Sequence, residues 1–409
     1  MPLTTEEGCA LAKRAIAGDP LRQPSVDGDW GVPLLACLAA AADPGWRGPA
    51  QQATLDWIAA RRHRVPAAAL FGGGMASLLA GLTLAERLLP RLATLTDTVR
   101  GRLATLTARR CGSLPPTRSA AYDLITGASG AVIALATAPR VQAAEISSAT
   151  RYLLDLCQDG DLGGLRHEPG RHEPGEREPG GREPLAWNAG RRNHGLAHGV
   201  PGVLAALVAA SPLVAGQHRG NHLMIVRRLA DYLIGEAFTD DRSVITWWPG
   251  SENSSADAPA ERAIRRQAWC YGTPGVAWQL FTAGRLLGDI DMAGFAAEAM
   301  SSLCLAWDDD FYLRDGSRTA QLTICHGAPG TMAVARLFAK YAELPEAASL
   351  ADHLDQALTE RIPAWCATTD AGPAVLDGTA GAIALLHPGR WPPGCLPALG
   401  LADGASLSK

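Results

Sequence analysis

A Gly-x-x-Gly element recurs along the chain, each time ahead of an apolar run, and it constrains the fold more than any other sequence feature. Five copies are clear: Gly127/Gly130, Gly199/Gly202, Gly272/Gly275, Gly327/Gly330 and Gly378/Gly381. Two weaker copies, Trp30-Gly-Val-Pro-Leu-Leu-Ala and Phe71-Gly-Gly-Gly-Met-Ala-Ser, bring the number to seven. Such a repeat indicates one structural unit that recurs and buries its apolar face against its neighbours.

The runs that follow these glycines predict helices buried on every side, since they are apolar nearly all round. The segments between them are more amphipathic and fit helices with one wet face: 5–17, 50–61, 92–109, 142–157, 221–236, 290–305 and 344–360. This alternation predicts an all-α fold, an α,α-toroid of about seven inner and seven outer helices. Glycines at the entrances of the inner helices would let the backbone turn sharply and approach closely. The turns would then crowd one end of the ring.

Composition agrees with a helical, globular chain and excludes several classes of function. Aromatic residues make up only 6% of the 409 residues, and alternating β-branched runs are scarce. A net charge of -4 gives no general attraction to nucleic acid or to an anionic membrane. The longest apolar stretch, 200–216, contains two prolines and is too short to span a bilayer.

The start of the chain and its cysteines predict a cytoplasmic protein. Met1-Pro-Leu-Thr-Thr-Glu-Glu lacks the basic and apolar regions of a secretory signal. Nine cysteines, an odd number, are scattered widely, which favours reduced thiols or metal ligation over a disulfide framework.

One segment does not fit the helical scheme. Residues 166–184 repeat Glu-Pro-Gly three times with nearly balanced charge and without core residues. This composition predicts a disordered surface insertion, in which His167 and His172 are solvated rather than metal ligands.

Unusual polar side chains lie in the turns before the repeat glycines, where a purely structural protein would need only small residues. Cys270, Cys325 and His326 together offer two thiolates and an imidazole, a set that zinc accepts with a fourth position open for water or substrate. A structural zinc would use four protein ligands, so three ligands indicate catalysis. The alternative is that both cysteines are ordinary buried small residues.

Two more turns offer groups for proton transfer. His198 suits a general acid or base because an unperturbed imidazole has a pKa of roughly 6.5. Asp123 either orients that imidazole or caps the next helix. Arg266, one helical turn before Cys270, either stabilises a developing oxyanion or belongs to a solvated face, and His194 is interpreted as a packing residue.

The motifs in these turns resemble those of a known family, the LanC-type lanthipeptide (lantibiotic) cyclases. Gly195-Leu-Ala-His-Gly199, Trp269-Cys-Tyr-Gly272 and Cys325-His-Gly327 resemble its three signature motifs in the same order. Tyr122-Asp-Leu-Ile-Thr-Gly127 resembles its aspartate turn. The resemblance covers about Phe71 to His387 and implies a fourteen-helix α,α-toroid that occupies residues 1–409 as a single domain.

The resemblance also implies a reaction. Members of the family close lanthionine and methyllanthionine rings by adding peptide cysteine thiolates to dehydroalanine or dehydrobutyrine in a dehydrated precursor peptide. The resemblance implies one zinc ion held by Cys270, Cys325 and His326, with His198 and Asp123 as acid/base residues. Arg266 and Tyr271 match further active-site positions of the family. A dehydratase and a transporter are implied as partners in a complex that could bring the protein to the membrane surface.

Two other functions remain open. A LanC-like zinc protein could bind glutathione or a partner at the same metal without forming rings. A prenyltransferase-like toroid also activates a peptide thiol with zinc, but its lipid pocket needs abundant aromatic residues, and this chain has 6%.

Overall fold

The fold is helical almost throughout. The computed structural model describes residues 10–15, 29–61, 67–113, 119–167, 188–250, 263–313, 320–368, 372–386 and 394–402. Within these ranges the strands are a short antiparallel pair, β1 (Phe238–Thr239) and β2 (Ile245–Thr246). The expectation of an all-α fold with little strand is therefore confirmed.

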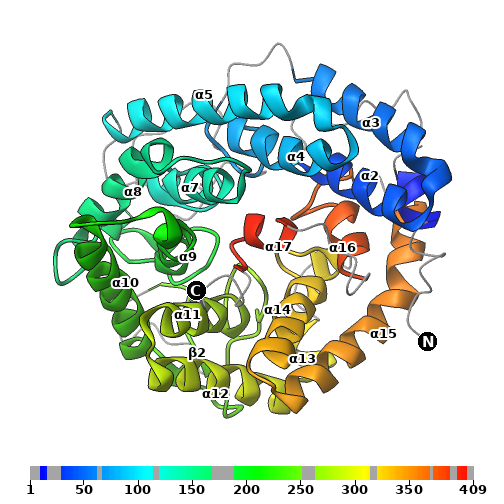
Figure 1. Cartoon of the computed structure of the whole chain (residues 1–409). Coiled ribbons are helices and arrows are strands. Elements are labelled where there is room, and N and C mark those ends of the chain that lie inside the picture. The colour runs from blue at the N-terminus through cyan, green and yellow to red at the C-terminus, as the bar shows by residue number, and fades with distance from the viewer. Residues whose placement is uncertain are drawn as a thin grey trace.

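The helices form two concentric rings, as Figure 1 shows. The inner ring consists of α2 (Gly31–Ala42), α4 (Met75–Leu88), α7 (Ala128–Thr137), α9 (Val200–Ala210), α11 (Thr273–Leu287), α14 (Ala328–Tyr341) and α16 (Thr379–Leu385). The outer ring consists of α3 (Arg47–Ala59), α5 (Ala93–Cys111), α8 (Ala143–Leu156), α10 (His218–Gly235), α12 (Ile290–Ala306) and α15 (Pro345–Thr368). The described chain also contains the short α-helices α6 (Ser119–Tyr122), α13 (Asp309–Tyr312) and α17 (Cys395–Ala398), together with short 3-10 helices.

This arrangement is the predicted α,α-toroid. Each of these six outer helices overlaps one of the amphipathic segments, and residues 10–15 of the first segment, 5–17, are helical as well. The rest of that first segment lies outside the described residues.

The two rings differ in burial as their sequences require. In α9 every residue except Ala209 is buried, because the helix is enclosed by neighbours on all sides. Helix α8 buries one face through residues such as Ile146 and Leu153, and it begins with a capping box between Gln142 and Glu145. Prolines 274 and 329 stand in the first turns of α11 and α14, where a missing N–H leaves no intrahelical bond unmade.

At the repeat glycines, the absence of a side chain permits close contact with neighbouring backbone. A Cβ on Gly130 would lie 2.2 Å from the carbonyl oxygen of Leu124, and a Cβ on Gly330 would lie 2.2 Å from that of Ile324. Among the first glycines of the five clear copies, only Gly272 has a positive φ, +89°. Among these five, the positive φ that favours glycine is thus confined to Gly272, whereas the close approach recurs.

Backbone hydrogen bonds join successive turns around the ring. They run from Leu70 N to Ile125 O, Leu124 N to Ala197 O, Leu196 N to Cys270 O, Cys270 N to Cys325 O, and Cys325 N to Leu376 O, over 2.8–3.2 Å. The last turn reaches the first through a side chain, since Val375 N donates to Asp29 Oδ1 at 2.8 Å. These bonds bring residues more than fifty positions apart in sequence to the same end of the toroid.

The centre of the ring is filled by the segment around α17 (Figure 1). Trp269 Nε1 donates to Leu399 O at 3.0 Å, and Gln279 Nε2 donates to Gly400 O at 3.0 Å. Leu399 and Leu401 are buried. The toroid therefore has a packed core and no open channel at this position.

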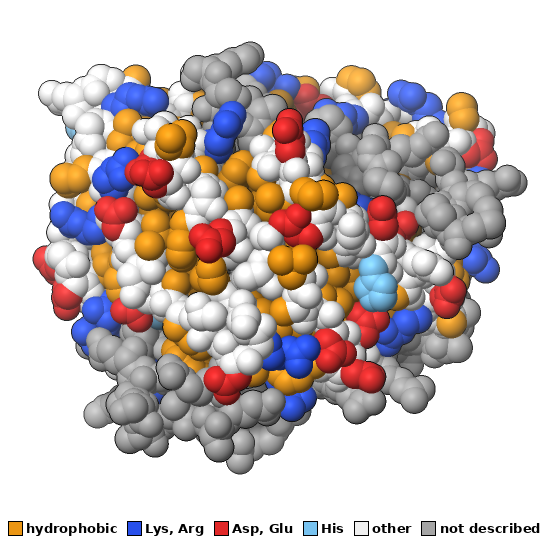
Figure 2. Space-filling view, turned by 90° about the horizontal axis from the view of Figure 1, so that it is seen from below, with side chains coloured by type: hydrophobic (Ala, Val, Ile, Leu, Met, Phe, Trp, Pro, Cys, Tyr) orange, Lys and Arg blue, Asp and Glu red, His pale blue; other side chains and the backbone are white. Residues whose placement is uncertain are grey.

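The outer surface carries no large area of one charge on the face seen in Figure 2, where acidic and basic side chains alternate with apolar ones. Ile290 and Leu305 of α12 are 84% and 77% exposed. None of the described helices is long and apolar enough to cross a membrane.

The predicted insertion begins later than residue 166. Arg166 pairs with Arg192 and His167 pairs with Ala189 in isolated bridges, and His167 is buried, so it is not the solvated residue that we expected. The remainder of 166–184, with His172, lies outside the described residues.

Candidate metal centre

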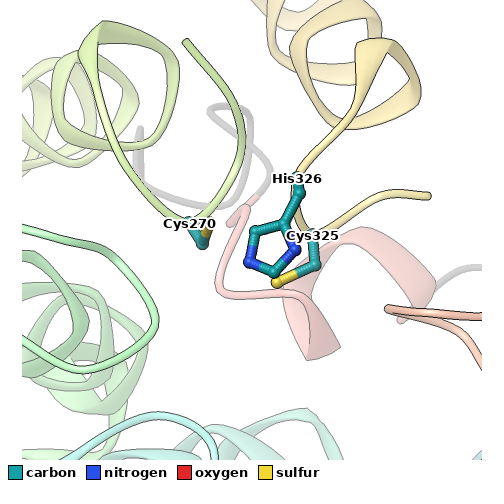
Figure 3. Close-up of side chains that lie close together, drawn as sticks. All are labelled: Cys270, Cys325 and His326. Atoms are coloured by element: carbon teal, nitrogen blue, oxygen red, sulfur yellow. The ribbon is translucent and has the colours of Figure 1, made fainter. Parts of the chain in front are cut away.

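Two neighbouring turns bring three candidate metal ligands together. Cys270 comes from the turn before α11, and Cys325 and His326 come from the turn before α14 (Figure 3). The two thiols and one imidazole nitrogen all lie within 4.8 Å of one another. Both cysteines are buried, whereas His326 is exposed, so the cluster has one side open to solvent.

The chemistry of this donor set fits a zinc ion. Sulfur atoms bound to one tetrahedral zinc at about 2.3 Å lie about 3.8 Å apart, so only small movements would close the cluster on an ion. A hydrogen bond with Cys270, and then burial, raises the pKa of the Cys325 thiol well above its usual value. A divalent cation would displace the proton of this thiol and compensate the charge of the buried thiolate.

At the same end of the toroid, His198 and Asp123 form a hydrogen-bonded pair from two further turns. His198 Nδ1 lies 2.7 Å from Asp123 Oδ2, and Asp123 is 2% exposed. The other carboxylate oxygen of Asp123 accepts from Thr126 N at 2.7 Å and from Gly127 N at 2.9 Å. With the Thr126 hydroxyl, which lies 3.2 Å from the same oxygen, three donors hold this carboxylate as an acceptor. The imidazole therefore donates from Nδ1, and its Nε2 is the atom left to exchange a proton. Asp123 thus both orients His198 and caps the turn before α7.

Arg266 and Tyr271 lie beside the cysteine cluster. Arg266 is exposed, and its positive charge acts on both Tyr271 and His326. Tyr271 is half-buried, and burial raises the pKa of its hydroxyl well above the usual value. Gln267 shapes this turn, because its Oε1 accepts from Thr273 N at 2.7 Å while Gly272 takes its positive φ.

Asp377, a polar residue at this end of the ring, was not singled out from the sequence alone. Asp377 directly precedes Gly378, as His198, Tyr271 and His326 precede their own glycines. Partial desolvation raises the pKa of its carboxyl, and the charge of His326 lowers it. Alignment of the seven turns on their glycines would have found it.

His194 is structural, as its place in the sequence indicated. It is buried, donates from Nδ1 to Trp248 O at 3.0 Å and accepts at Nε2 from the Tyr232 hydroxyl at 2.8 Å. Burial lowers its pKa to about 4, so it is neutral near neutral pH.

Comparison with known proteins identifies the family of this chain. A sequence model of the lanthionine synthetase C-like protein family matches residues 52–388. The chain belongs to the lanthionine synthetase C-like family. The solved structure of nisin cyclase superposes with a TM-score of 0.74 over 98% of this chain and 97% of that chain, at 17% identity. No match was found among curated proteins.

The lanthionine synthetase C-like match includes every turn that contributes to the candidate site, from Asp123 to Asp377. The likeness to nisin cyclase, at this identity, establishes the shared fold. The chain therefore has the toroid of the lanthionine synthetase C-like family together with a cysteine and histidine cluster at one end of it.

Proposed function

We propose that this protein is a zinc-dependent lanthionine synthetase C-type cyclase that forms lanthionine or methyllanthionine thioether rings. Cys270, Cys325 and His326 would hold one zinc ion and leave a position for a substrate sulfur. Only about 3% of a free cysteine with a pKa of roughly 8.5 is ionised at pH 7, and zinc supplies the chemistry that keeps such a sulfur as thiolate. Two protein thiolates keep the site electron-rich, which preserves the nucleophilicity of a third.

Proton transfer is assigned to the His198 and Asp123 pair. When the peptide thiolate adds to the β-carbon of dehydroalanine or dehydrobutyrine, an S–C bond forms and the π electrons of the alkene move into an enolate. The α-carbon of this enolate then requires a proton. His198 Nε2 would deliver it, while Asp123 holds Nδ1–H at 2.7 Å and balances the imidazolium charge.

Stabilisation of the enolate oxygen is assigned to Arg266 and Tyr271. An exposed guanidinium beside the cluster and a hydroxyl one residue from Cys270 are donors of the kind that stabilise a developing oxyanion. Because Arg266 is open to solvent, a bound peptide would have to cover it for its charge to act at full strength.

The observation that carries the proposal is the convergence of a thiolate-rich cluster and an oriented histidine on one end of a lanthionine synthetase C-like toroid. The corresponding substrate is a dehydrated precursor peptide with leader and core. A dehydratase that makes it and a transporter that exports it are the proposed partners, in the cytoplasm or at the membrane surface through that complex.

Ring closure conserves mass, so the test counts thiols. Zinc-loaded protein would be incubated with dehydrated candidate precursor peptides, followed by alkylation and mass spectrometry. We expect one alkylation site to disappear for each ring formed, and only with zinc present. If no candidate loses thiols while the zinc protein binds glutathione, the protein is a thiol-binding member of the family without ring-forming activity.

A further inference from the structure

Asn193 is a buried polar side chain at the candidate site that the proposed reaction has not used. It lies in the turn that contains His198, and none of its surface is exposed to solvent. Its side chain spans two turns, because it contacts both the backbone of Gly195 in its own turn and Tyr271 in the turn before α11.

The orientation of the Asn193 amide is fixed by its neighbours. Gly195 N donates to Oδ1 at 2.7 Å, and a backbone N–H can only donate, so the atom that it meets must be the amide oxygen. The amide nitrogen Nδ2 therefore faces the Tyr271 hydroxyl, 2.9 Å away. Since Nδ2 can only donate, the phenol oxygen accepts, and its own hydrogen is directed away from Asn193.

Two glycines of the same turn enclose this pair. A Cβ on Gly195 would lie 2.5 Å from Cε1 of the Tyr271 ring. A Cβ on Gly199 would lie 2.9 Å from Asn193 Oδ1 and 2.0 Å from its carbonyl oxygen. The Gly195-Leu-Ala-His-Gly199 motif thus supplies His198 and also the space in which Asn193 and Tyr271 meet.

We propose that Asn193 is a positioning residue that holds Tyr271 as a hydrogen-bond donor toward the metal centre, and this rests on the proposed cyclase function. Tyr271 directly follows Cys270 and lies within electrostatic reach of Cys325 and Arg266. In the addition step the sulfur–carbon bond forms, the alkene electrons pass to the carbonyl oxygen, and Tyr271 donates a hydrogen bond to that oxygen while it keeps its proton. The proton for the α-carbon comes from His198.

The Asn193→Asp substitution tests the direction of this hydrogen bond. It preserves the shape of the side chain and the acceptor for Gly195 N, but it replaces the donor that faces Tyr271 with an acceptor. The tyrosine hydrogen is then drawn to the carboxylate and away from the substrate. We expect kcat to fall by about 10²-fold, the loss typical of one oxyanion donor, with KM unchanged and zinc content at one equivalent.

A double-mutant cycle separates positioning from a general structural effect. Tyr271→Phe removes the donor itself, so it should lower kcat to a similar extent, and the double variant should be no worse than either single variant. Asn221→Asp makes the same chemical change on an exposed position of α10 and should leave kcat unchanged. Multiplying losses in the double variant would mean that the two residues act separately, which would overturn the proposal.

A second readout does not depend on turnover. With ¹³C at the ring Cζ of tyrosine, the protein's six tyrosines give few resonances, and Tyr271→Phe assigns that of Tyr271. Asn193→Asp should shift this resonance, because the hydroxyl changes from acceptor to donor at that contact, while Asn221→Asp should not. The kinetic probe is a panel of synthetic peptides that each carry one dehydroalanine and one cysteine.

The outcomes distinguish the two proposals. An active wild-type protein whose Asn193→Asp variant keeps both its kcat and its Tyr271 resonance overturns the positioning role alone. A wild-type protein that leaves the thiols of every peptide free, cognate candidates included, overturns the cyclase function and the positioning role together.

Discussion

The turns before α2 and α4 and the later turns of the ring use the same architecture for different purposes. Trp30 and Phe71, from the first two turns, are buried and pack with ring centroids 6.3 Å apart, and Phe71 packs against Trp269 at 6.1 Å. The later turns hold His198, Tyr271, His326 and Asp377 immediately before their glycines. The first part of the ring closes the fold, and the later part carries the residues of the proposed chemistry.

This difference shows which positions the fold requires. Close backbone contact at the glycines, an apolar side chain directed into the core, and backbone bonds between turns recur in the later turns whatever their chemistry. The residue just before each glycine differs from turn to turn, from threonine at position 126 to histidine at 198 and aspartate at 377. Changes in the two regions should therefore affect different measurements.

The largest effect is expected in the chemical part of the ring. His198→Asn removes the proton donor at Nε2 while the amide can still contact Asp123, so ring formation should fall by roughly 10²- to 10⁴-fold with zinc retained. Alkylation and mass spectrometry would measure the rate, and metal analysis the zinc. The ratio of the two epimers at the α-carbon of the product would also show whether stereocontrol is lost.

A matched histidine tests whether the location of His198 matters. His353 also bonds an aspartate, Asp309, at 3.0 Å, but this pair is exposed on the outer ring, with 54% of the His353 side chain accessible. His353→Asn should leave the rate unchanged. Equal rates for both variants would remove His198 from the reaction.

The next effect concerns the shared architecture. Gly330→Ala places a methyl group 2.2 Å from Ile324 O and 2.8 Å from Trp269 Cβ, and the backbone must move to accept it. We expect the free energy of unfolding to fall by about 3 kcal/mol or more. Gly294→Ala, on the exposed face of α12 with no atom within 4 Å of the new Cβ, should instead stabilise the protein by about 0.5–1 kcal/mol. Urea denaturation of both variants measures the difference, and similar values would mean that the glycine contacts do not support the ring.

A smaller effect is expected at Asp29, whose carboxyl group joins the first turn of the ring to the last. Burial raises the pKa of Asp29 from 3.8 to about 6, so between these values the folded protein retains a proton that the unfolded chain has lost. Stability should therefore fall as pH rises through this window, by up to about 3 kcal/mol, and stay level on either side. Asn at this position cannot titrate, so the difference in unfolding free energy between Asp29→Asn and wild type should change with pH only in this window. A difference that does not vary with pH would show that the pKa of Asp29 is not raised in the folded protein.

Much of the fold could be predicted because its determinants are local. The apolar runs after the glycines mark inner helices by composition, and outer segments such as 92–109 match their helices, here Ala93–Cys111, within two residues. The closing contact between Asp29 and Val375 could not be predicted, since it joins residues 346 positions apart through one side chain. Arg166 and His167 were misassigned because their order depends on pairing with residues 192 and 189 across the insertion.

The candidate site, like the fold, could be predicted only in part. Cys270, Cys325 and His326 have unusual side chains at repeated positions, and the structure brings them together. Asn193 was passed over because an asparagine in a turn is ordinary, and its bond to Tyr271 depends on how two turns face each other. Asp377 was missed because a lone carboxylate before a glycine carries no signal until the turns are aligned.

The most direct test of the metal centre is the zinc content and cyclisation activity of the Cys325→Ala variant, with Cys111→Ala at the end of outer helix α5 as the control. Three ligands with one open position predict that Cys325→Ala loses its zinc and ring formation together. In the cobalt-substituted wild-type protein, a peptide thiol should add to the thiolate charge-transfer absorption, whereas Cys111→Ala should behave like wild type. A Cys325→Ala variant that keeps a full equivalent of zinc would contradict the assignment.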